Sequence, residues 1–417
     1  MKNKITPWLQ SIGIVIPFMG QGFIFFIRTL LPAVGNPSLV TLAFQILSLL
    51  LIYSNRSFKT LYKGNFILFI TYIAFLIYTL FFLFFNNKES GNRILDLVYI
   101  SLGLAYLVLL HKVDYSISSY ILKVILVLTL LINVSLIYTI LTNPKFVIGM
   151  RATVNFISPN NSGFSGNPHI YARNGLNAII ISLLFLFKTK NNSFLTYIFY
   201  WICLLIGISV LFLTLVKTAI LIAPLIFIAF LITKKNYIQS KINSTKILNS
   251  LITVLSITFF FIIDKIQNLI QAYGETAFKV VEVSMNTIFG KSSEKGIDVS
   301  TLERVKNLNY VINLFQENPT YFIFGNGFRT FYVDVPFIEV FLNFGLIGIL
   351  MFIAYLIPLY MFSIKNILKS SDNFQLFLSI FIISTILSMF TQGRPMEYGF
   401  YISAAIYIRF LGTDKFV

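Results

Sequence analysis

The chain has 417 residues, of which 57% belong to the set AVILMFWYC and only 11% are charged. A soluble domain carries about 25% charged residues, and the mean hydropathy here is +0.82, so composition excludes a soluble enzyme. In a soluble protein the net charge of +17 would indicate nucleic-acid binding. In a membrane protein the positions of the basic residues first indicate which loops face the cytoplasm. The single cysteine, Cys203, excludes a disulfide framework and a cysteine metal site.

Apolar runs between polar or basic breaks predict an all-α polytopic membrane protein with about 12 transmembrane helices, because a spanning helix needs about 20 mostly apolar residues. No small-residue cleavage site follows the first run, so we expect an uncleaved signal anchor. One long apolar stretch is divided at Lys217 into two spans. The runs in chain order are 8–27, 37–53, 66–86, 94–110, 118–141, 175–187, 193–213, 218–233, 247–263, 336–361, 373–391 and 397–411.

The distribution of Lys and Arg predicts the orientation, because cytoplasmic loops retain positive charge. With the N-terminus inside, the inner segments hold most of the basic residues and only Asp114, Asp372 and Asp414 as acids. Both termini are therefore expected in the cytoplasm, which agrees with an even number of spans. Localisation in the bacterial inner membrane follows from the family resemblance described below.

Two predicted outer (periplasmic) loops, 142–174 and 264–335, are too long to be simple connectors. The second has an apolar periodicity that predicts an amphipathic helix ending at Asn318-Pro319. The whole chain, 1–417, is expected to form a single transmembrane domain that includes these loops. We therefore looked for functional residues in and next to these loops.

The first outer loop is cationic and contains no Asp or Glu. Its basic residues include Lys145, Arg151 and Arg173, and an Arg side chain offers a planar fork of donors to phosphate oxygens. The pattern indicates a binding site for a phosphate-bearing ligand. The alternative is nonspecific contact with anionic headgroups.

His169 and Lys217 each allow two interpretations. His169 lies beside cationic residues and could accept a proton as a general base, or it could serve only as a hydrogen-bonding residue. Lys217 is an ionisable residue within an apolar stretch, which is costly and hence a functional hypothesis. It could reach a phosphate in a cavity or extend to the headgroups.

The second loop and the span that follows it hold the remaining candidates. Arg304 lies on the predicted amphipathic region, and Arg329 follows a glycine-rich turn. Asp334 precedes the tenth span, and Glu339 lies within it. A carboxylate in an apolar run is expensive to insert and should face a cavity or a basic partner, so Glu339 is either functional or paired with Arg329 or Arg394 to hold the fold.

The order of these motifs resembles the O-antigen polymerase and ligase superfamily. The resemblance rests on an Arg-bearing outer loop with a Pro-Asn turn, a basic residue at Lys217, the Arg304 helix, an Asn-Pro pair followed by Gly-x-Gly-Phe, and an acid that leads to Phe-Gly-Leu-Ile-Gly. Ligases of this superfamily often have His where Asp334 stands. An acid at this position is more typical of Wzy-type polymerases, so the resemblance is greater to that branch. Lys217 stands where the family usually has Arg.

The resemblance implies a membrane glycosyltransferase of GT-C-like architecture, which passes a growing glycan from undecaprenyl pyrophosphate to the non-reducing sugar of a second lipid-linked repeat unit. In this interpretation Asp334 is the acceptor base, with Glu339 or His169 as alternatives. The substrate-binding residues that it implies for the pyrophosphate and the glycan are Arg151, Arg173, Lys217, Arg304 and Arg329. A chain-length-regulating co-polymerase is an implied partner, besides membrane lipids.

No Asp-x-Asp pair or His/Cys cluster offers an obvious outer metal site, so the sequence predicts a metal-independent reaction without a cofactor. Two other functions stay open. An O-antigen ligase would share the fold but use lipid A core as acceptor, and a lipid-linked oligosaccharide flippase or transporter would share the twelve-span plan. Transporters usually place their polar sites on broken helices in repeated halves, and this sequence shows no repeat.

Overall fold

The computed structural model describes most of the predicted helices and parts of both long loops. The described residues are 5–30, 37–53, 61–85, 93–142, 152, 155–156, 164–165, 167–188, 193–235, 249–250, 252–253, 299–331, 333, 335–370, 372–391 and 393–412.

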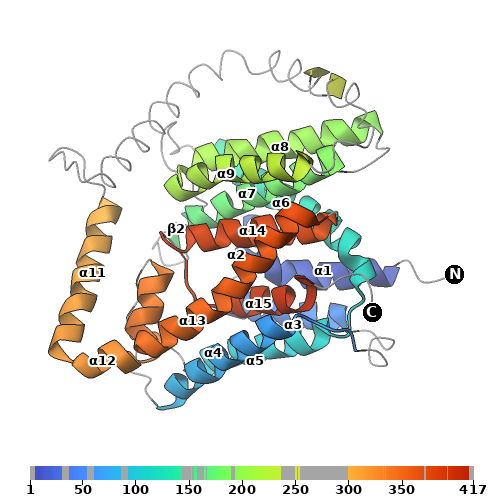
Figure 1. Cartoon of the computed structure of the whole chain (residues 1–417). Coiled ribbons are helices and arrows are strands. Elements are labelled where there is room, and N and C mark those ends of the chain that lie inside the picture. The colour runs from blue at the N-terminus through green and yellow to red at the C-terminus, as the bar shows by residue number, and fades with distance from the viewer. Residues whose placement is uncertain are drawn as a thin grey trace. The chain divides into compact units, whose positions relative to one another are not determined.

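Helices dominate the described residues, as the apolar composition predicts, and one two-stranded antiparallel pair accompanies them (Figure 1). The helices are α1 (Ile5–Met19), α2 (Gln21–Leu30), α3 (Pro37–Ile52), α4 (Phe66–Phe85), α5 (Arg93–Leu110), η2 (Tyr115–Ile117), α6 (Ser118–Thr142), α7 (Pro168–Lys188), α8 (Phe194–Thr214), α9 (Lys217–Lys235), α11 (Val299–Glu317), α12 (Pro319–Phe324), α13 (Pro336–Lys369), α14 (Asn373–Ser388) and α15 (Tyr398–Phe410). The strands are β1 (Asn155–Phe156) and β2 (Phe164–Ser165).

Among the described residues, six helices are long and apolar enough to cross a membrane, or seven if the pair α1 and α2 counts as one span. That pair is bent by 97° at its break. Helices α3, α9 and α14 coincide with predicted runs but count as shorter apolar helices of 10–17 residues, and α15 has 13 residues. The chain is therefore a polytopic, membrane-embedded helical protein, while the number twelve stays a prediction. Most of the predicted run 247–263 lies outside the described residues.

The chain divides into two compact units, each assembled from separate stretches of sequence. The first comprises residues 1–51, 116–291 and 367–377, and the second comprises residues 52–115, 292–366 and 378–417. In the first unit α7 packs along α8 and against α6 and α9, and α6 also contacts α1 and α2 (Figure 1). In the second unit α15 packs against α5 and also contacts α4.

Two predicted helix boundaries in the first unit have local causes. Helix α8 ends where Leu215 adopts a left-handed backbone with φ 49°, and α9 begins at Lys217, which confirms the predicted break. Helix α7 begins at Pro168, seven residues before the predicted span start. Asn167 caps it by accepting a 2.9 Å hydrogen bond from the His169 N–H, and proline fits the first helical position, where no N–H is needed.

The second long loop is partly helical. As predicted, an amphipathic helix, α11, ends just before Asn318 and Pro319, and α12 follows it. Val311 of α11 packs against Val333 and Leu342 in a small apolar core, and the partly buried Leu314 joins it. This core attaches α11 to the start of α13.

Arg409 holds together the end of the second unit where α15 terminates. Its side chain is 2% exposed, and its guanidinium donates to the backbone carbonyls of Leu110 (3.1 Å), Val113 (2.6 Å) and Lys63 (3.3 Å). The guanidinium also lies 5.3 Å from the ring centre of Tyr62. A buried cation is tolerated here because backbone oxygens at the C-terminus of α5 carry partial negative charge.

Candidate functional site

The site is built around a break in α13. The backbone leaves helical geometry at Gly345, with φ 63° and ψ −164°. A break frees carbonyl oxygens that would otherwise accept helical hydrogen bonds, and here each finds another donor. The Leu342 and Asn343 carbonyls accept from the N–H groups of Asn326 (2.8 Å) and Gly327 (3.0 Å), and the Tyr78 hydroxyl donates to the Phe344 carbonyl (3.2 Å).

Glycine is required on both sides of this contact. A Cβ at Gly345 would lie 2.3 Å from the Ile323 carbonyl oxygen, and a Cβ at Gly325 would lie 2.3 Å from the Asn343 carbonyl oxygen. Both glycines also have positive φ, which side chains disfavour. The Gly-x-Gly-Phe and Phe-Gly-Leu-Ile-Gly motifs therefore have a structural reason: they let the turn 325–327 dock against the broken helix.

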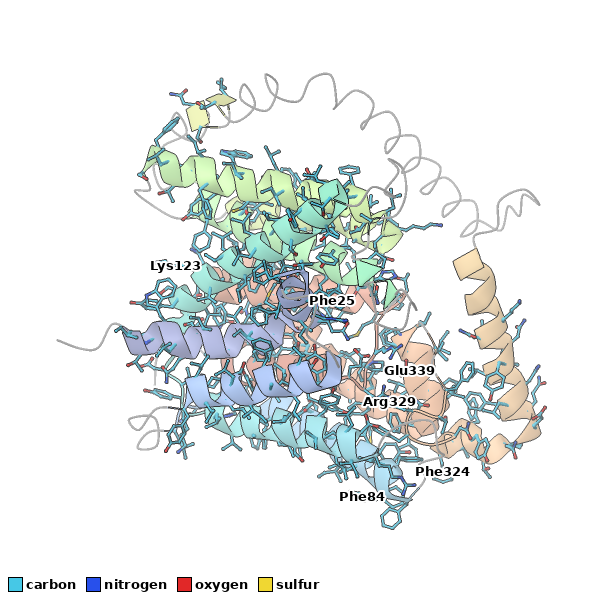
Figure 2. All side chains as sticks on the ribbon, turned by 180° about the vertical axis from the view of Figure 1, so that it is seen from behind. Phe25, Phe84, Lys123, Phe324, Arg329 and Glu339 are labelled. Carbon is cyan, nitrogen blue, oxygen red and sulfur yellow. The ribbon has the colours of Figure 1, made fainter. Side chains whose placement is uncertain are left out.

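The docked turn continues into Arg329, Thr330 and Phe331, whose side chains line a cavity of about 280 Å³. Glu339 from the first turn of α13 lines it too (Figure 2). Arg394, Met396 and Glu397, from the segment just before α15, complete the lining. All of these residues belong to the second unit.

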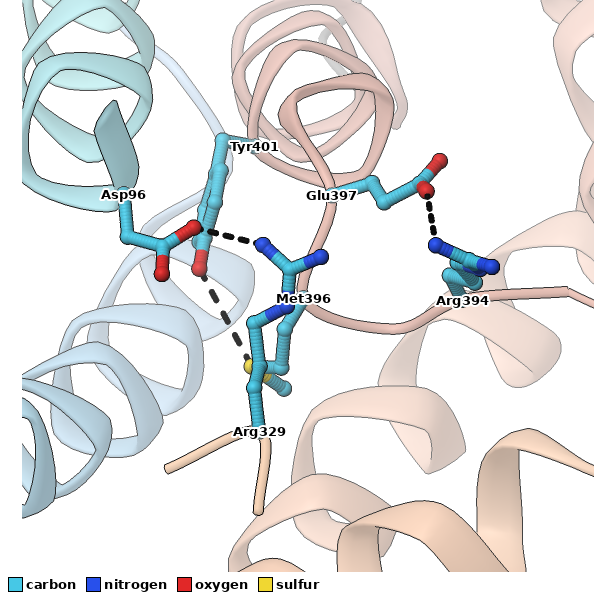
Figure 3. A network of polar contacts seen from close by, with 6 residues as sticks. All are labelled: Asp96, Arg329, Arg394, Met396, Glu397 and Tyr401. Carbon is cyan, nitrogen blue, oxygen red and sulfur yellow. Dashed lines mark hydrogen bonds and ion pairs between the residues drawn. The ribbon is translucent and has the colours of Figure 1, made fainter. Parts of the chain in front are cut away.

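Arg329 is held by an ion pair with the start of α5. Its Nη1 donates to Asp96 Oδ1 at 2.5 Å, and the Asp96 side chain is only 4% exposed (Figure 3). Arg329 also has a positive φ of 50°, which is uncommon for a residue with a side chain. Such strained residues persist where their surroundings determine the conformation, and they concentrate at functional sites.

Arg394 is held by a second ion pair on the other side of the cavity. Its Nη1 lies 3.2 Å from Glu397 Oε1, three residues later in the chain. Between the two pairs, Met396 is buried and its sulfur accepts a 3.9 Å hydrogen bond from the Tyr401 hydroxyl (Figure 3). The cavity thus has one apolar wall between two arginine–carboxylate pairs.

Glu339, unlike Asp96 and Glu397, is in no ion pair among the described residues. It is 4% exposed, and its Oε2, like Asp96 Oδ2, is buried without a hydrogen-bond partner among the described residues. The two ion pairs around it join Arg329 to Asp96 and Arg394 to Glu397. A buried polar atom without a partner is costly and calls for an explanation; a ligand in the cavity would supply one.

The structure brings two of the sequence-predicted site residues together, Arg329 and Glu339. Asp334 and Arg151 lie outside the described residues, as does the side chain of Arg304, whose backbone lies in α11. His169 and Arg173 are in the first two turns of α7 rather than in a loop, and Arg173 is exposed. Lys217 is the first residue of α9.

Those three residues belong to the first unit. Four residues before Lys217, the Leu213 carbonyl at the end of α8 accepts a 2.8 Å hydrogen bond from the Ala152 N–H of the first long loop. That bond ties the loop to the break that precedes Lys217. In the part of the chain that the structure describes, no three His, Cys, Asp or Glu side chains gather as metal ligands.

The sequence interpretation missed Asp96, Met396 and Glu397, and it treated Arg394 only as a possible partner of Glu339. Asp96 carried a usable signal, because it is an acid in the first turn of an apolar run. Glu397 and Arg394 gave none, since charges in a short connection before a span are ordinary.

No protein-family model matches the sequence, and no curated protein matches it.

Proposed function

We propose that the protein is a membrane glycosyltransferase that polymerises a surface polysaccharide such as O-antigen in the bacterial inner membrane. It would transfer a growing glycan from undecaprenyl pyrophosphate to a sugar hydroxyl of another lipid-linked repeat unit. The proposal includes the twelve-span layout with both termini in the cytoplasm and two large periplasmic loops.

One observation carries the proposal. A polar cavity that contains the buried Glu339, whose Oε2 has no hydrogen-bond partner among the described residues, lies where the apolar helices α5, α13 and α15 begin. Four of its seven lining residues belong to the segment Gly325 to Gly348, which carries part of the family resemblance. Glycosyl transfer to a hydroxyl needs a group that accepts a proton and donors that position the sugar. The cavity offers both from Glu339 and the two arginines.

The remaining predicted residues take the roles that the resemblance implies. Arg151, Arg173, Lys217 and Arg304 would bind the pyrophosphate, whose negative charge grows as the glycosidic bond to it breaks. Asp334, with Glu339 or His169 as alternatives, would accept the proton of the acceptor hydroxyl. A co-polymerase that regulates chain length would be a partner of the complete system.

A deletion strain tests the function. A polymerase deletion should abolish long chains and leave single repeat units on the lipid A core. Loss of all attached glycan would instead identify a ligase. The deletion strain should then be complemented with Arg151→Ala, Arg304→Ala or Asp334→Asn at matched protein levels. Wild-type ladders from all three variants would contradict the residue roles.

A second function is favoured by a separate observation. The 97° bend between α1 and α2 and the break in α13 are discontinuous helices of the kind that transporters use around their substrates. A flippase for lipid-linked oligosaccharide is therefore the alternative. In the same deletion strain it predicts lipid-linked intermediates trapped in the inner leaflet.

A further inference from the structure

The charge balance of the cavity indicates what kind of ligand it takes. Its two arginines, Arg329 and Arg394, face three carboxylates, those of Asp96, Glu339 and Glu397. Each arginine already forms an ion pair, so a phosphate bound here would lie against carboxylates of the same charge sign rather than against uncompensated cations. Whether or not Glu339 carries a proton, this set of side chains is not net positive. The cavity therefore lacks the charge excess of a phosphate site.

The same side chains suit a neutral polyhydroxyl ligand. Carboxylate oxygens accept hydrogen bonds from hydroxyl groups, and guanidinium N–H groups donate to hydroxyl oxygens. Met396 and the ring of Phe331 provide apolar surface for the C–H face of a sugar, as ligand sites commonly do. Phe331 is itself braced by Tyr310, with the ring centres 4.7 Å apart. The volume of about 280 Å³ lies near the lower end for small-molecule pockets, roughly 300–1,000 Å³, and so fits one sugar ring.

We infer that this cavity is the acceptor subsite, that it binds the terminal neutral sugar of the acceptor chain, and that Glu339 Oε2 contacts the attacking hydroxyl and takes its proton. The inference rests on the proposed function and makes it more specific.

The step balances as follows. The acceptor oxygen forms a bond to the anomeric carbon of the donor glycan, and the bond between that carbon and the pyrophosphate oxygen breaks. The pyrophosphate leaves with the bonding electron pair, and the hydroxyl proton moves to Glu339 Oε2. Glu339 is the only carboxylate among the described lining residues that is not in an ion pair, which leaves it available for this proton.

A fluorescent reporter tests the ligand class directly. Phe331→Trp places an indole in the cavity, and both natural tryptophans, Trp8 and Trp201, belong to the first unit, so substitution of each by Phe leaves one reporter. The purified full-length protein is titrated with glucose, galactose, rhamnose and N-acetylglucosamine, and separately with glucuronate and inorganic pyrophosphate. We expect at least one neutral sugar to change the emission, and glucuronate to bind at least about 10-fold more weakly than glucose or galactose, a difference of about 1.4 kcal/mol. Tighter binding of glucuronate or pyrophosphate than of every neutral sugar would overturn the assignment, as would no response to any neutral sugar.

Kinetics test the role of Glu339. With lipid-linked repeat units extracted from the deletion strain as substrate, Glu339→Gln should lower kcat by at least about 100-fold, the usual contribution of a general base. Glu339→Ala should recover part of its rate when formate is added, because a small carboxylate can enter the vacated space. Glu317→Gln is the matched control, since it makes the same charge change on an exposed part of α11 and should retain the wild-type rate.

The two proposals fail in different ways. If wild-type protein makes no polymer from these substrates while the tryptophan reporter still prefers neutral sugars, the polymerase proposal fails and the sugar site stands. If the wild type polymerises and Glu339→Gln keeps its kcat, or if formate rescues nothing in Glu339→Ala while that variant remains folded, the role of Glu339 is wrong and the polymerase stands.

Discussion

Gly345→Ala tests whether the break in α13 organises the cavity. The new methyl group would lie 2.3 Å from the Ile323 carbonyl oxygen and 2.5 Å from the Gly325 nitrogen, where real Cβ atoms essentially never approach below 3.0 Å. Both neighbours are backbone atoms, so the strain cannot be relieved by rotating a side chain. The turn that carries Arg329 must retreat from the helix by about 0.7 Å to restore 3.0 Å.

The expected cost has two parts. The backbone at Gly345, φ 63° and ψ −164°, lies in a region that only glycine occupies freely, and placing alanine there costs about 1–3 kcal/mol. Displacing the turn also weakens the hydrogen bonds from Asn326 and Gly327 to the helix carbonyls, each worth about 1 kcal/mol. Together these give a loss of about 3–5 kcal/mol in the free energy of unfolding.

The measurement is denaturant unfolding of the purified protein in detergent micelles, read by circular dichroism. Gly399→Ala is the matched control, because no atom lies within 4 Å of a Cβ at that helical position, and alanine there should be neutral or stabilising by about 0.5–1 kcal/mol. If Gly345→Ala unfolds within about 1 kcal/mol of the wild type, the docked turn does not depend on this glycine and the reasoning is refuted.

Four further outcomes are expected. Arg409→Met should destabilise the protein by about 2–4 kcal/mol in the same unfolding assay, because three buried carbonyls lose their charged donor; an unchanged midpoint would contradict this. Arg329→Met should cost about 2–4 kcal/mol by leaving Asp96 buried without its partner, and adding Asp96→Leu should recover much of that loss, whereas strictly additive effects would show that the pair is not coupled. Burial, with a smaller contribution from the charge of Arg409, lowers the pKa of His111, so the folded state resists protonation and stability should fall as the pH drops below about 6.5; His111→Gln should flatten that part of the unfolding profile against pH. EDTA should leave polymer synthesis by the purified protein unchanged, and loss of turnover that added divalent metal restores would show the prediction of metal independence to be wrong.

Long apolar stretches made the helical class predictable. A run of 20 or more apolar residues has few soluble alternatives, so α4, α6 and α8 lie close to where the sequence places them. The amphipathic period near Tyr310 and the Asn318-Pro319 stop likewise predicted α11 and its end. Each of these features depends on residues within one turn or one run, which is the range over which sequence patterns are informative.

The boundaries that the sequence misplaced depend on single local groups. Hydropathy averages over a window and therefore started the sixth span at 175, whereas the capping residue Asn167 and Pro168 start α7 earlier. The bend between α1 and α2 lies in one continuous apolar run, where a hydropathy average has nothing to detect. Backbone geometry at one or two residues decided both cases.

The sequence alone determined that this is a basic, helical membrane protein. It also identified Glu339 as an ionisable residue in an apolar run, where insertion into a membrane is costly. Tertiary structure decided which charges meet. Asp96 and Arg329 are 233 positions apart in the chain and are joined through the packing of the second unit. Glu339 Oε2 has no hydrogen-bond partner among the described residues, while the two cavity arginines pair with Asp96 and Glu397. Pairing between distant side chains depends on how helices pack, and no local pattern of residue types encodes it.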